Sequence, residues 1–590
     1  MKRFLFVILC VSMLLSTTSC GNAGGDGAGT GDTVPISFWI PVGEDSTYYM
    51  SYEENPGVKY FETLEFNGNK IDLSFVVPIA GSERDNFNTL LATEEYSDLM
   101  YMSFSTISAA EMLADEIIYD LTPYMEEYMP NYMAYLEKFP DLKPYAYTTV
   151  DGERRILQLY SVSEEILGNF MGFLYRRDWV AKYGTNPTTG EPFTYGFADP
   201  NDKTTWQDDV IFPSGESEPV YISDWEWMFE IFTRALADLG ISDGYSFSPF
   251  FKGYNEDGGL YSGFGGGAPL WYVDENLNAG FGGDSDNMRA YLQALNNWYE
   301  KGWLDKSFAE HTSDQVYAIN TDLIHTGKVG LWIGRRAETG TQMDTGDGFT
   351  SGMVVYGARQ PINDIYGTAE QQGQIPDSFY QYSRLRESLV VSRKVAEEDL
   401  PTVLSFMDYL FTVEGGAVLC FGLNKEQFEA TQDPIYIKYG LTNGAYQTEV
   451  QPDGKIKYNR DASLLTDNNL ASAMAAKRMS IGLYGEGFVP ALNASYTDYA
   501  RDAMARWDYY ENIGFIDRSV RAQFSTEESN TYNKIYSNVD TFMSSNVPLF
   551  IMGKLDIDND QDWGDYCKML NKYSPEKVTN IYQRVFDSIK

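Results

Sequence analysis

Histidine is nearly absent from this chain, and its scarcity excludes several classes of enzyme. The 590 residues include only His311 and His325, so no HExxH motif, no Cys/His zinc site and no histidine-based triad can be assembled. A P-loop and a GxGxxG turn that opens a helix are also missing. The 85 Asp and Glu residues are too many to single out an acid–base pair. We therefore expect no catalytic residue, no metal site and no cofactor, and we expect that the protein is not an enzyme.

Cysteine and positive charge are scarce as well. Beyond Cys20 only Cys420 and Cys567 remain, and a fold of this size does not need a disulfide between them. The formal net charge of −41 repels nucleic acid and anionic lipid. It also disfavours polyanionic glycans unless a local basic site compensates. We expect no nucleic-acid partner and two unpaired thiols.

Long apolar runs are confined to the N-terminus. After residue 20 no stretch reaches the roughly 18 uninterrupted apolar residues that a membrane-spanning helix needs. At the start, a basic Met1–Arg3 precedes the apolar Phe4–Leu15, and small residues lead to Cys20. This run is too short for a stable anchor helix and is typical of an export signal.

The segment around Cys20 resembles a bacterial lipoprotein signal, in which the cysteine is lipidated and becomes the new N-terminus. Thr17 departs from that pattern, because these signals usually carry Leu three residues before the cysteine. The resemblance implies a signal peptide over 1–19, lipidation of Cys20 and attachment to the membrane through the lipid alone. The Gly/Asp/Thr-rich stretch over 20–33 is typical of a flexible tether. An ordinary cleaved signal with an incidental cysteine is the alternative.

Strands and helices alternate after the tether. The patterns predict strands over 34–40, 71–77 and 98–102, with helices over 84–91 and 109–113. Longer amphipathic helices follow Ser223-Asp224, ending at Gly240, and Asp284-Ser285-Asp286, ending at Gly302. The Pro- and Gly-rich stretch over 185–219 predicts an irregular insertion. This order predicts an α/β fold around largely parallel sheets, with ligands bound beyond the carboxyl ends of the strands.

The acidic stretch from Asp556 to Asp562 resembles the start of a calcium loop. Its sixth position is Gln561 instead of Gly, and its twelfth is Cys567 instead of Glu. A helix that begins near Asp562 accounts for these acids more simply, because carboxylates stabilise a helix N-terminus.

Many short segments, in order along the chain, resemble bacterial extracellular solute-binding proteins of the large, carbohydrate-associated ABC-importer type. They include Asp120–Tyr132, Phe173–Trp179, Ser223–Ile231, Phe281–Gln293, Trp298–Trp303, Gly327–Gly334, Phe406–Gly416 and Phe421–Gln427. The resemblance implies a two-lobed clamp like that of periplasmic binding proteins, with discontinuous lobes around a hinge cleft. We expect one lobe over 34–160 and about 360–420, and the other over 161–355 and about 421–590.

Sugar binding needs exposed aromatic faces and a few directed polar groups. Candidates at predicted strand and loop ends are Trp39, Ser103, Ser105, Trp271, Tyr272, Trp332 and Arg335. Core packing is the alternative for each tryptophan, and a solvated surface pair is the alternative for Arg335 and Arg336. Trp225, Trp298 and Trp303 stand on amphipathic helices, so we expect them in the core.

The resemblance implies a monomeric extracellular or periplasmic lipoprotein that captures a solute, most simply a neutral oligosaccharide, and delivers it to the permease subunits of an ABC importer. Two alternatives stay open. One is a SusD-like glycan-binding lipoprotein, whose helical repeats this chain does not show. The other is a secreted carbohydrate-active enzyme that uses two of the many carboxylates.

Overall fold

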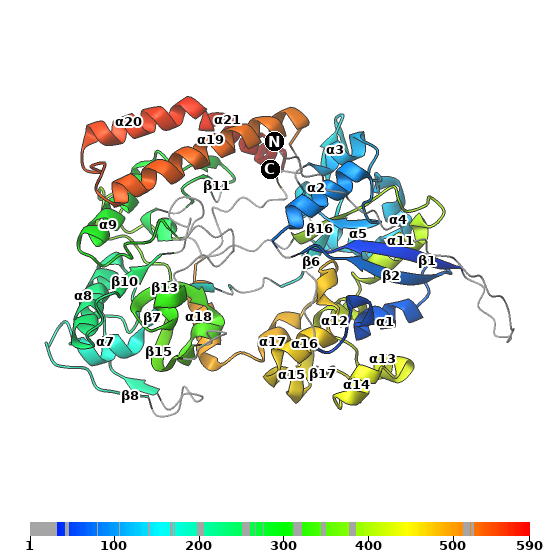
Figure 1. Cartoon of the computed structure of the whole chain (residues 1–590), viewed down its shortest axis with the longest axis horizontal. Coiled ribbons are helices and arrows are strands. Elements are labelled where there is room, and N and C mark those ends of the chain that lie inside the picture. The colour runs from blue at the N-terminus through cyan, green and yellow to red at the C-terminus, as the bar shows by residue number, and fades with distance from the viewer. Residues whose placement is uncertain are drawn as a thin grey trace, which may run out of the picture.

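Two separate β-sheets organise the chain, and each sheet lies in its own group of helices (Figure 1). The computed structural model describes residues 32–41, 47–79, 81–105, 107–139, 142–165, 169, 171–197, 206–249, 260–265, 267–274, 276–310, 321–343, 350–376, 385–510, 520 and 524–589. The predicted signal peptide, Cys20, nearly all of the tether and His311 lie outside these residues. We call the two groups the first and the second lobe.

The first lobe is built on a six-stranded sheet. Its strands, in spatial order, are β19 (Leu483–Tyr484), β6 (Leu159–Ser163), β16 (Leu385–Val391), β3 (Leu99–Tyr101), β1 (Thr33–Trp39) and β2 (Lys70–Val76). β16 is antiparallel to both of its neighbours, whereas the other pairs are parallel. Five strands therefore point the same way, and their carboxyl ends share one edge of the sheet.

Many short helices complete the first lobe. They are α1 (Pro56–Thr63), α2 (Glu83–Thr93), α3 (Ala109–Ala114), α4 (Met125–Tyr128), α5 (Pro130–Lys138), α6 (Lys143–Ala146), α11 (Leu400–Tyr409), α12 (Val413–Phe421), α13 (Lys425–Thr431), α14 (Pro434–Lys438), α15 (Ala462–Thr466), α16 (Asn468–Met474) and α17 (Phe488–Asn493). Two hairpins join them, β4 (Thr148–Val150) with β5 (Glu153–Arg155) and β17 (Tyr446–Val450) with β18 (Ile456–Arg460).

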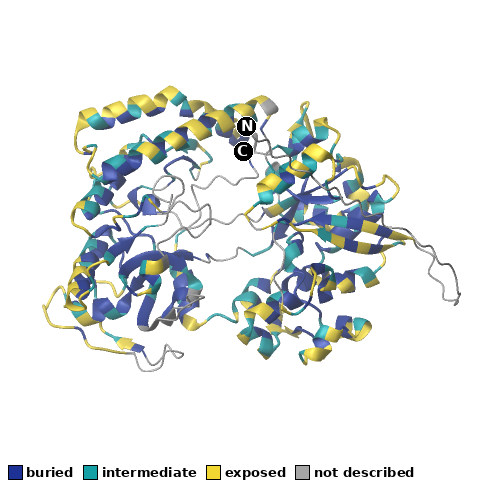
Figure 2. Cartoon of the chain, viewed as in Figure 1, coloured by how far each residue is buried: buried dark blue, intermediate teal, exposed yellow. Residues whose placement is uncertain are grey.

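The second lobe is built on a five-stranded sheet of mixed direction. Its order is β10 (Tyr245–Ser248), β13 (Val329–Arg335), β7 (Met171–Arg176), β15 (Thr350–Ala358) and β14 (Gly340–Met343). All six residues of β7 are buried, as are six of the seven in β13, and such continuous apolar strands are typical of a sheet covered on both faces. Figure 2 shows the buried residues gathered in the two sheets.

The helices of the second lobe are α7 (Arg177–Tyr183), α8 (Ile222–Asp238), α9 (Asp286–Glu300), α10 (Thr321–His325), α18 (Asp498–Trp507), α19 (Thr526–Ile551), α20 (Asp560–Leu570) and α21 (Pro575–Ile589). The last three, orange to red in Figure 1, lie along one side of the lobe. Two hairpins complete it, β8 (Tyr195–Phe197) with β9 (Trp206–Asp208) and β11 (Trp271–Val273) with β12 (Ala279–Phe281).

Most of the predicted elements are confirmed. β1, β2, β3, α2 and α3 lie within two residues of the predicted ranges, and Ser285 caps α9 by accepting a hydrogen bond from the Met288 amide. Trp225, Trp298 and Trp303 are buried in the second core, as expected. α20 begins at Asp560, two residues before the predicted start, with Asn559 as its cap. The stretch over 185–219, predicted to be irregular, contains the β8–β9 hairpin.

The lobes divide the chain differently from the expected boundaries. The core of the first lobe includes Leu423, Phe428 and Leu441, and it continues to Ile481. β19 then pairs with β6 and extends the first sheet. The segment from 421 to about 484 therefore packs in the first lobe, because it contributes both core side chains and an edge strand there. The part from α18 onward packs in the second lobe, as expected.

The described elements indicate that the chain passes between the lobes three times, always at the same edge of each sheet. The first passage leaves β6 at Ser163 and enters β7 at Met171. The second leaves β15 at Ala358 and enters β16 at Leu385. The third runs from β19 through α17 to α18. Since β6 and β19 end, and β16 begins, at the carboxyl edge of the parallel strands, that edge is the one turned to the second lobe.

Cys420 and Cys567 lie in different lobes and form no disulfide. Among the described residues no single helix is long and apolar enough to cross a membrane. The bent pair α11 and α12 meets the length and composition test together. Most of its apolar side chains are buried in the first lobe, and Val413 at the start of α12 is exposed.

We predict that Asn55→Ala strongly destabilises the first lobe. The buried Asn55 caps α1 by accepting from the amides of Gly57 and Val58, and its Nδ2 donates to the carbonyls of Ala473 and Ala475 at 2.9 and 3.1 Å. Losing a cap and leaving buried carbonyls unpaired should cost about 2–4 kcal/mol in urea unfolding.

Asn559→Ala is the matched control. Asn559 caps α20 at an exposed site, so its replacement should cost about 1 kcal/mol or less. Equal costs for the two variants would contradict the role of Asn55 in joining distant segments.

Candidate functional site

The close packing of α18 on the second sheet determines which residues lie beside the segments that connect the lobes. A Cβ atom added at Gly172 of β7 would lie 2.4 Å from the ring of Trp507, and one added at Gly357 of β15 would lie 2.5 Å from the Cα atom of Ala503. The Trp507 indole also donates to the carbonyl of Phe173 at 2.9 Å. The two glycines thus let the helix approach closely, and its C-terminus lies where β7 begins and β15 ends.

Residues of the first two passages meet here with the residues that directly follow α18. They are Asn169, Arg359, Asp508, Tyr509 and Tyr510, which we call the crossing site. Asn169 is buried, and its backbone N and Nδ2 atoms both donate to Oδ1 of Asp508, while Nδ2 also donates to the Trp507 carbonyl. Partial burial raises the pKa of Asp508, and the hydrogen bonds from Asn169 oppose that shift.

Tyr509 gives the crossing site an exposed aromatic face. Its side chain is 61% exposed, although most large apolar side chains in the lobes are buried. The guanidinium of Arg359 lies over its ring at 4.6 Å from the centroid, a distance typical of a cation–π contact. The ring of Tyr510 lies edge-on to that of Tyr509, with 5.0 Å between the centroids, and its hydroxyl is buried. An aromatic face beside donor groups is suited to binding a sugar ring.

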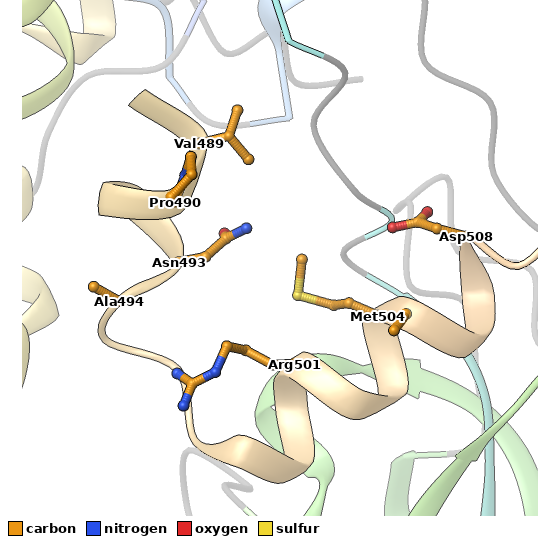
Figure 3. A pocket seen from close by; sticks show the side chains of 8 residues that line it. Val489, Pro490, Asn493, Ala494, Arg501, Met504 and Asp508 are labelled. Atoms are coloured by element: carbon orange, nitrogen blue, oxygen red, sulfur yellow. The ribbon is translucent and has the colours of Figure 1, made fainter. Parts of the chain in front are cut away.

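A pocket of about 570 Å³ opens beside the crossing site, between a helix of each lobe (Figure 3). Val489, Pro490 and Asn493 of α17 line one wall, and Met504 and Asp508 face them from α18. This volume lies within the range of roughly 300–1,000 Å³ found for ligand pockets. Because its walls belong to different lobes, a change in the angle between the lobes changes the pocket.

The three predicted tryptophan platforms are buried in the structure. Trp39 is covered by Phe87, and its indole donates to Oδ1 of Asn86 on α2 at 2.8 Å. Trp332 lies in a core formed with Trp507 and Met504. In this conformation these two rings present no face to a ligand, which favours the packing alternative for both.

Trp271 and Tyr272 lie against the C-terminal helices. Trp271 is nearly buried, stacks on Tyr536 and donates to the carbonyl of Pro575 at 3.2 Å. Tyr272 is half-buried beside Gly267 and Gly280, and burial raises its pKa. The sequence did not indicate that the C-terminal helices pack on Trp271, because α19 and α21 lie about 250 or more residues further along the chain.

Ser103 and Arg335 lie on the sheet edges that face the passages. Ser103 is exposed at the end of β3, where its hydroxyl donates to Glu387. Arg335 ends β13 and pairs at 3.0 Å with the buried Glu338. Ser105 donates to the carbonyl of Ile107 at 2.7 Å and so shapes its own loop. Ligand contact by these residues stays a prediction.

The sequence analysis missed the crossing site. Its strongest signal was the pair Tyr509-Tyr510, which directly follows an amphipathic helix whose apolar positions include Tyr499, Ala503 and Trp507. Tyr509 comes just after this helix and does not continue the spacing of its apolar positions, so the pattern does not place its ring in the core.

The sequence matches no family model and no curated protein sequence. Solved structures match almost the whole chain. An extracellular solute-binding protein from Bifidobacterium longum subsp. infantis has a TM-score of 0.62 and 14% identity, over 94% of this chain and 98% of that one. The chain has the fold of a two-lobed solute-binding protein.

Two further structures share this clamp fold. The S. pneumoniae ABC-transporter substrate binding protein FusA, in complex with kestose, has a TM-score of 0.61 and 15% identity, over 94% of this chain and 99% of that one. An HMO binding ABC-transporter associated solute binding protein from Bifidobacterium longum infantis has a TM-score of 0.59 and 14% identity, over 95% and 99%.

We predict a large effect on stability for one aromatic residue of this region and a small effect for another. Trp332→Ala empties a fully buried site and should lower the free energy of unfolding by about 3–5 kcal/mol. Tyr509→Ala removes an exposed ring and should change it by about 0.5 kcal/mol or less. Chemical denaturation of both variants measures the contrast, and a Trp332→Ala protein as stable as the wild type would contradict the core role.

Proposed function

We propose that this protein is an extracellular solute-binding protein that captures an oligosaccharide and delivers it to an ABC importer. The observation that carries this proposal is the clamp geometry: two lobes with separate cores, joined by passages at one shared edge, in a fold that matches solute-binding proteins over nearly the full chain. Closure of such lobes on a ligand lowers the free energy of the closed state. A transporter can then distinguish loaded from empty protein by shape.

An oligosaccharide is the ligand class that fits the crossing site best. Tyr509 supplies an apolar ring face beside Arg359 and Tyr510, and the amide of Asn493 lines the adjacent pocket. The similar FusA structure is described as a complex with kestose, and another similar protein as HMO binding. These descriptions support a sugar ligand for this chain.

The enzyme alternative needs two carboxylates placed on either side of a scissile bond. Burial raises the pKa of Asp408, Asp433 and Asp508. Asp408 caps the N-terminus of α5 and Asp433 caps α14, so both bind backbone amides. Asp508 alone belongs to the crossing site, which favours binding over catalysis. The SusD-like alternative loses support because the clamp fold, instead of helical repeats, spans the chain.

The location and the partners belong to the same proposal. The N-terminal signal and Cys20 support a lipid-anchored protein that faces the outside of the cell membrane or the periplasm. It acts as a monomer whose two lobes meet the permease subunits. Its only attachment to the membrane is the lipid.

A binding protein should be stabilised by its ligand and leave it unchanged. We expect one class of oligosaccharide to raise the melting temperature, since a ligand at a hundredfold excess over its Kd adds about 2.7 kcal/mol. Chromatography of the sugar after incubation should show no turnover. Turnover would establish an enzyme, and a melting temperature unmoved by every sugar class would reject the proposed ligand.

The anchor is tested separately. Replacing Cys20 with Ala removes the thiol that lipidation requires, so Cys20→Ala protein should be released into the medium or the periplasm. Fractionation followed by immunoblotting measures the released share. If the Cys20→Ala protein stays with the membranes as the wild type does, the lipid anchor is rejected while the binding function is untouched.

A further inference from the structure

Arg359 is an arginine of the crossing site for which the described residues supply no counter-ion. It directly follows β15, at the edge where the chain passes to the first lobe. Within the part of the chain that the structure describes, its guanidinium has no hydrogen bond and no ion pair, and its Nε atom is buried without a partner. Its contact is the face of Tyr509 at 4.6 Å. A guanidinium that lies over a ring still has its N–H donors free for an acceptor.

Three other arginines near the passages are paired. Arg335 binds Glu338, Arg501 binds Asp498, and Arg506 binds both Glu218 and Asp502. This is the expected state in a chain with 85 acidic and 44 basic residues, where acids outnumber bases. The unpaired guanidinium of Arg359 departs from this expectation, as does Arg460 of β18, whose Nε atom is also buried without a partner. A partly desolvated charge without a partner destabilises the fold.

Tyr510 adds a second unused donor beside Arg359. Its hydroxyl is buried and has no hydrogen-bond partner among the described residues. Burial raises the pKa of Tyr510, and the charge of the nearby Arg359 opposes that shift. The hydroxyl is thus protonated at neutral pH and available to donate.

Within the described residues, Asp508, the carboxylate of the crossing site, forms no ion pair with Arg359. Oδ1 of Asp508 accepts both hydrogen bonds from Asn169 instead. The crossing site therefore combines a free cation, a free hydroxyl donor and an exposed ring. A carboxylate complements this set, since it accepts charge-assisted hydrogen bonds and supplies the missing negative charge. A sugar hydroxyl would accept a hydrogen bond but would leave the charge uncompensated.

We propose that the crossing site binds an acidic sugar residue, with its carboxylate held by Arg359 and Tyr510 and its ring against Tyr509. This inference rests on the proposed oligosaccharide-binding function and refines the ligand that the sequence suggested. The strongly negative chain repels a polyanion, and one free arginine balances one carboxylate. The expected ligand is an oligosaccharide that carries an isolated acidic residue on a neutral chain.

Calorimetric titration against matched sugars tests this inference. The probes are aldouronic acids and sialyllactose, each with its carboxyl-reduced form, together with free glucuronate. The wild type should bind a carboxylated oligosaccharide more tightly than its reduced form and more tightly than free glucuronate. Arg359→Gln should lose roughly ten- to a hundredfold in affinity for the carboxylated form, the range expected for charged hydrogen bonds. Its affinity for the reduced form should change little.

Two further variants keep the test specific. Tyr510→Phe removes the second donor and should also reduce the preference for the carboxylated form. Arg154→Gln is the matched control, because Arg154 lies over Tyr147 at the same 4.6 Å in the β4–β5 hairpin, before the start of β6 and thus at the opposite edge of the first sheet. It should bind as the wild type does. Melting temperatures of all variants confirm that each is folded.

Several results would overturn the inference. They are equal binding of the carboxylated and reduced sugars, a preference that survives in Arg359→Gln, an equal loss of both sugars in that variant, and free glucuronate binding as tightly as the oligosaccharide. In the first three cases oligosaccharide binding itself would stand. Binding of neither sugar form would instead reject the proposed function together with the inference.

Discussion

The contact between α18 and the second sheet is the constraint on which the clamp depends. Gly172 lies one residue after the first passage ends, and Gly357 lies one residue before the last residue of β15, where the second passage begins. α18 is the end of the third passage. By pressing Trp507 and Ala503 onto these two glycines, one helix ties the second-lobe ends of all three passages together. Small residues at such contacts set the distance between a helix and a sheet, because any side chain would separate them.

The crossing site is a consequence of that contact. With α18 fixed at this depth, its C-cap residue Asp508 meets Asn169, and Tyr509 reaches the guanidinium of Arg359. The side chains that contact ligand in this proposal are therefore supported by a rigid helix and by the ends of two strands. Rigid support of this kind lowers the entropic cost of binding, because fewer side chains become ordered when the ligand binds.

Local sequence patterns were sufficient to predict the strands and helices, but not which distant helices pack over them. The alternation of residues in β1 and β2 and the apolar faces of α8 and α9 are properties of short segments, so they could be interpreted from the sequence. Whether Trp39 or Trp332 is exposed depends on α2 and α18, which lie elsewhere in the chain. The lobe boundary at 421 failed for a similar reason. β19 has only two residues, too few for any periodicity, yet it completes the first sheet.

The discontinuity of the first lobe also shapes how the chain acquires its structure. Its core needs side chains from Val34 near the beginning and Ile481 far along the sequence. Contacts of such long sequence separation raise the contact order, and folding slows because a large loop must close before they form. The first lobe therefore remains incomplete until most of the polypeptide is available. The location proposed above requires passage through a narrow translocation channel, and this delay would keep the chain unfolded while it passes.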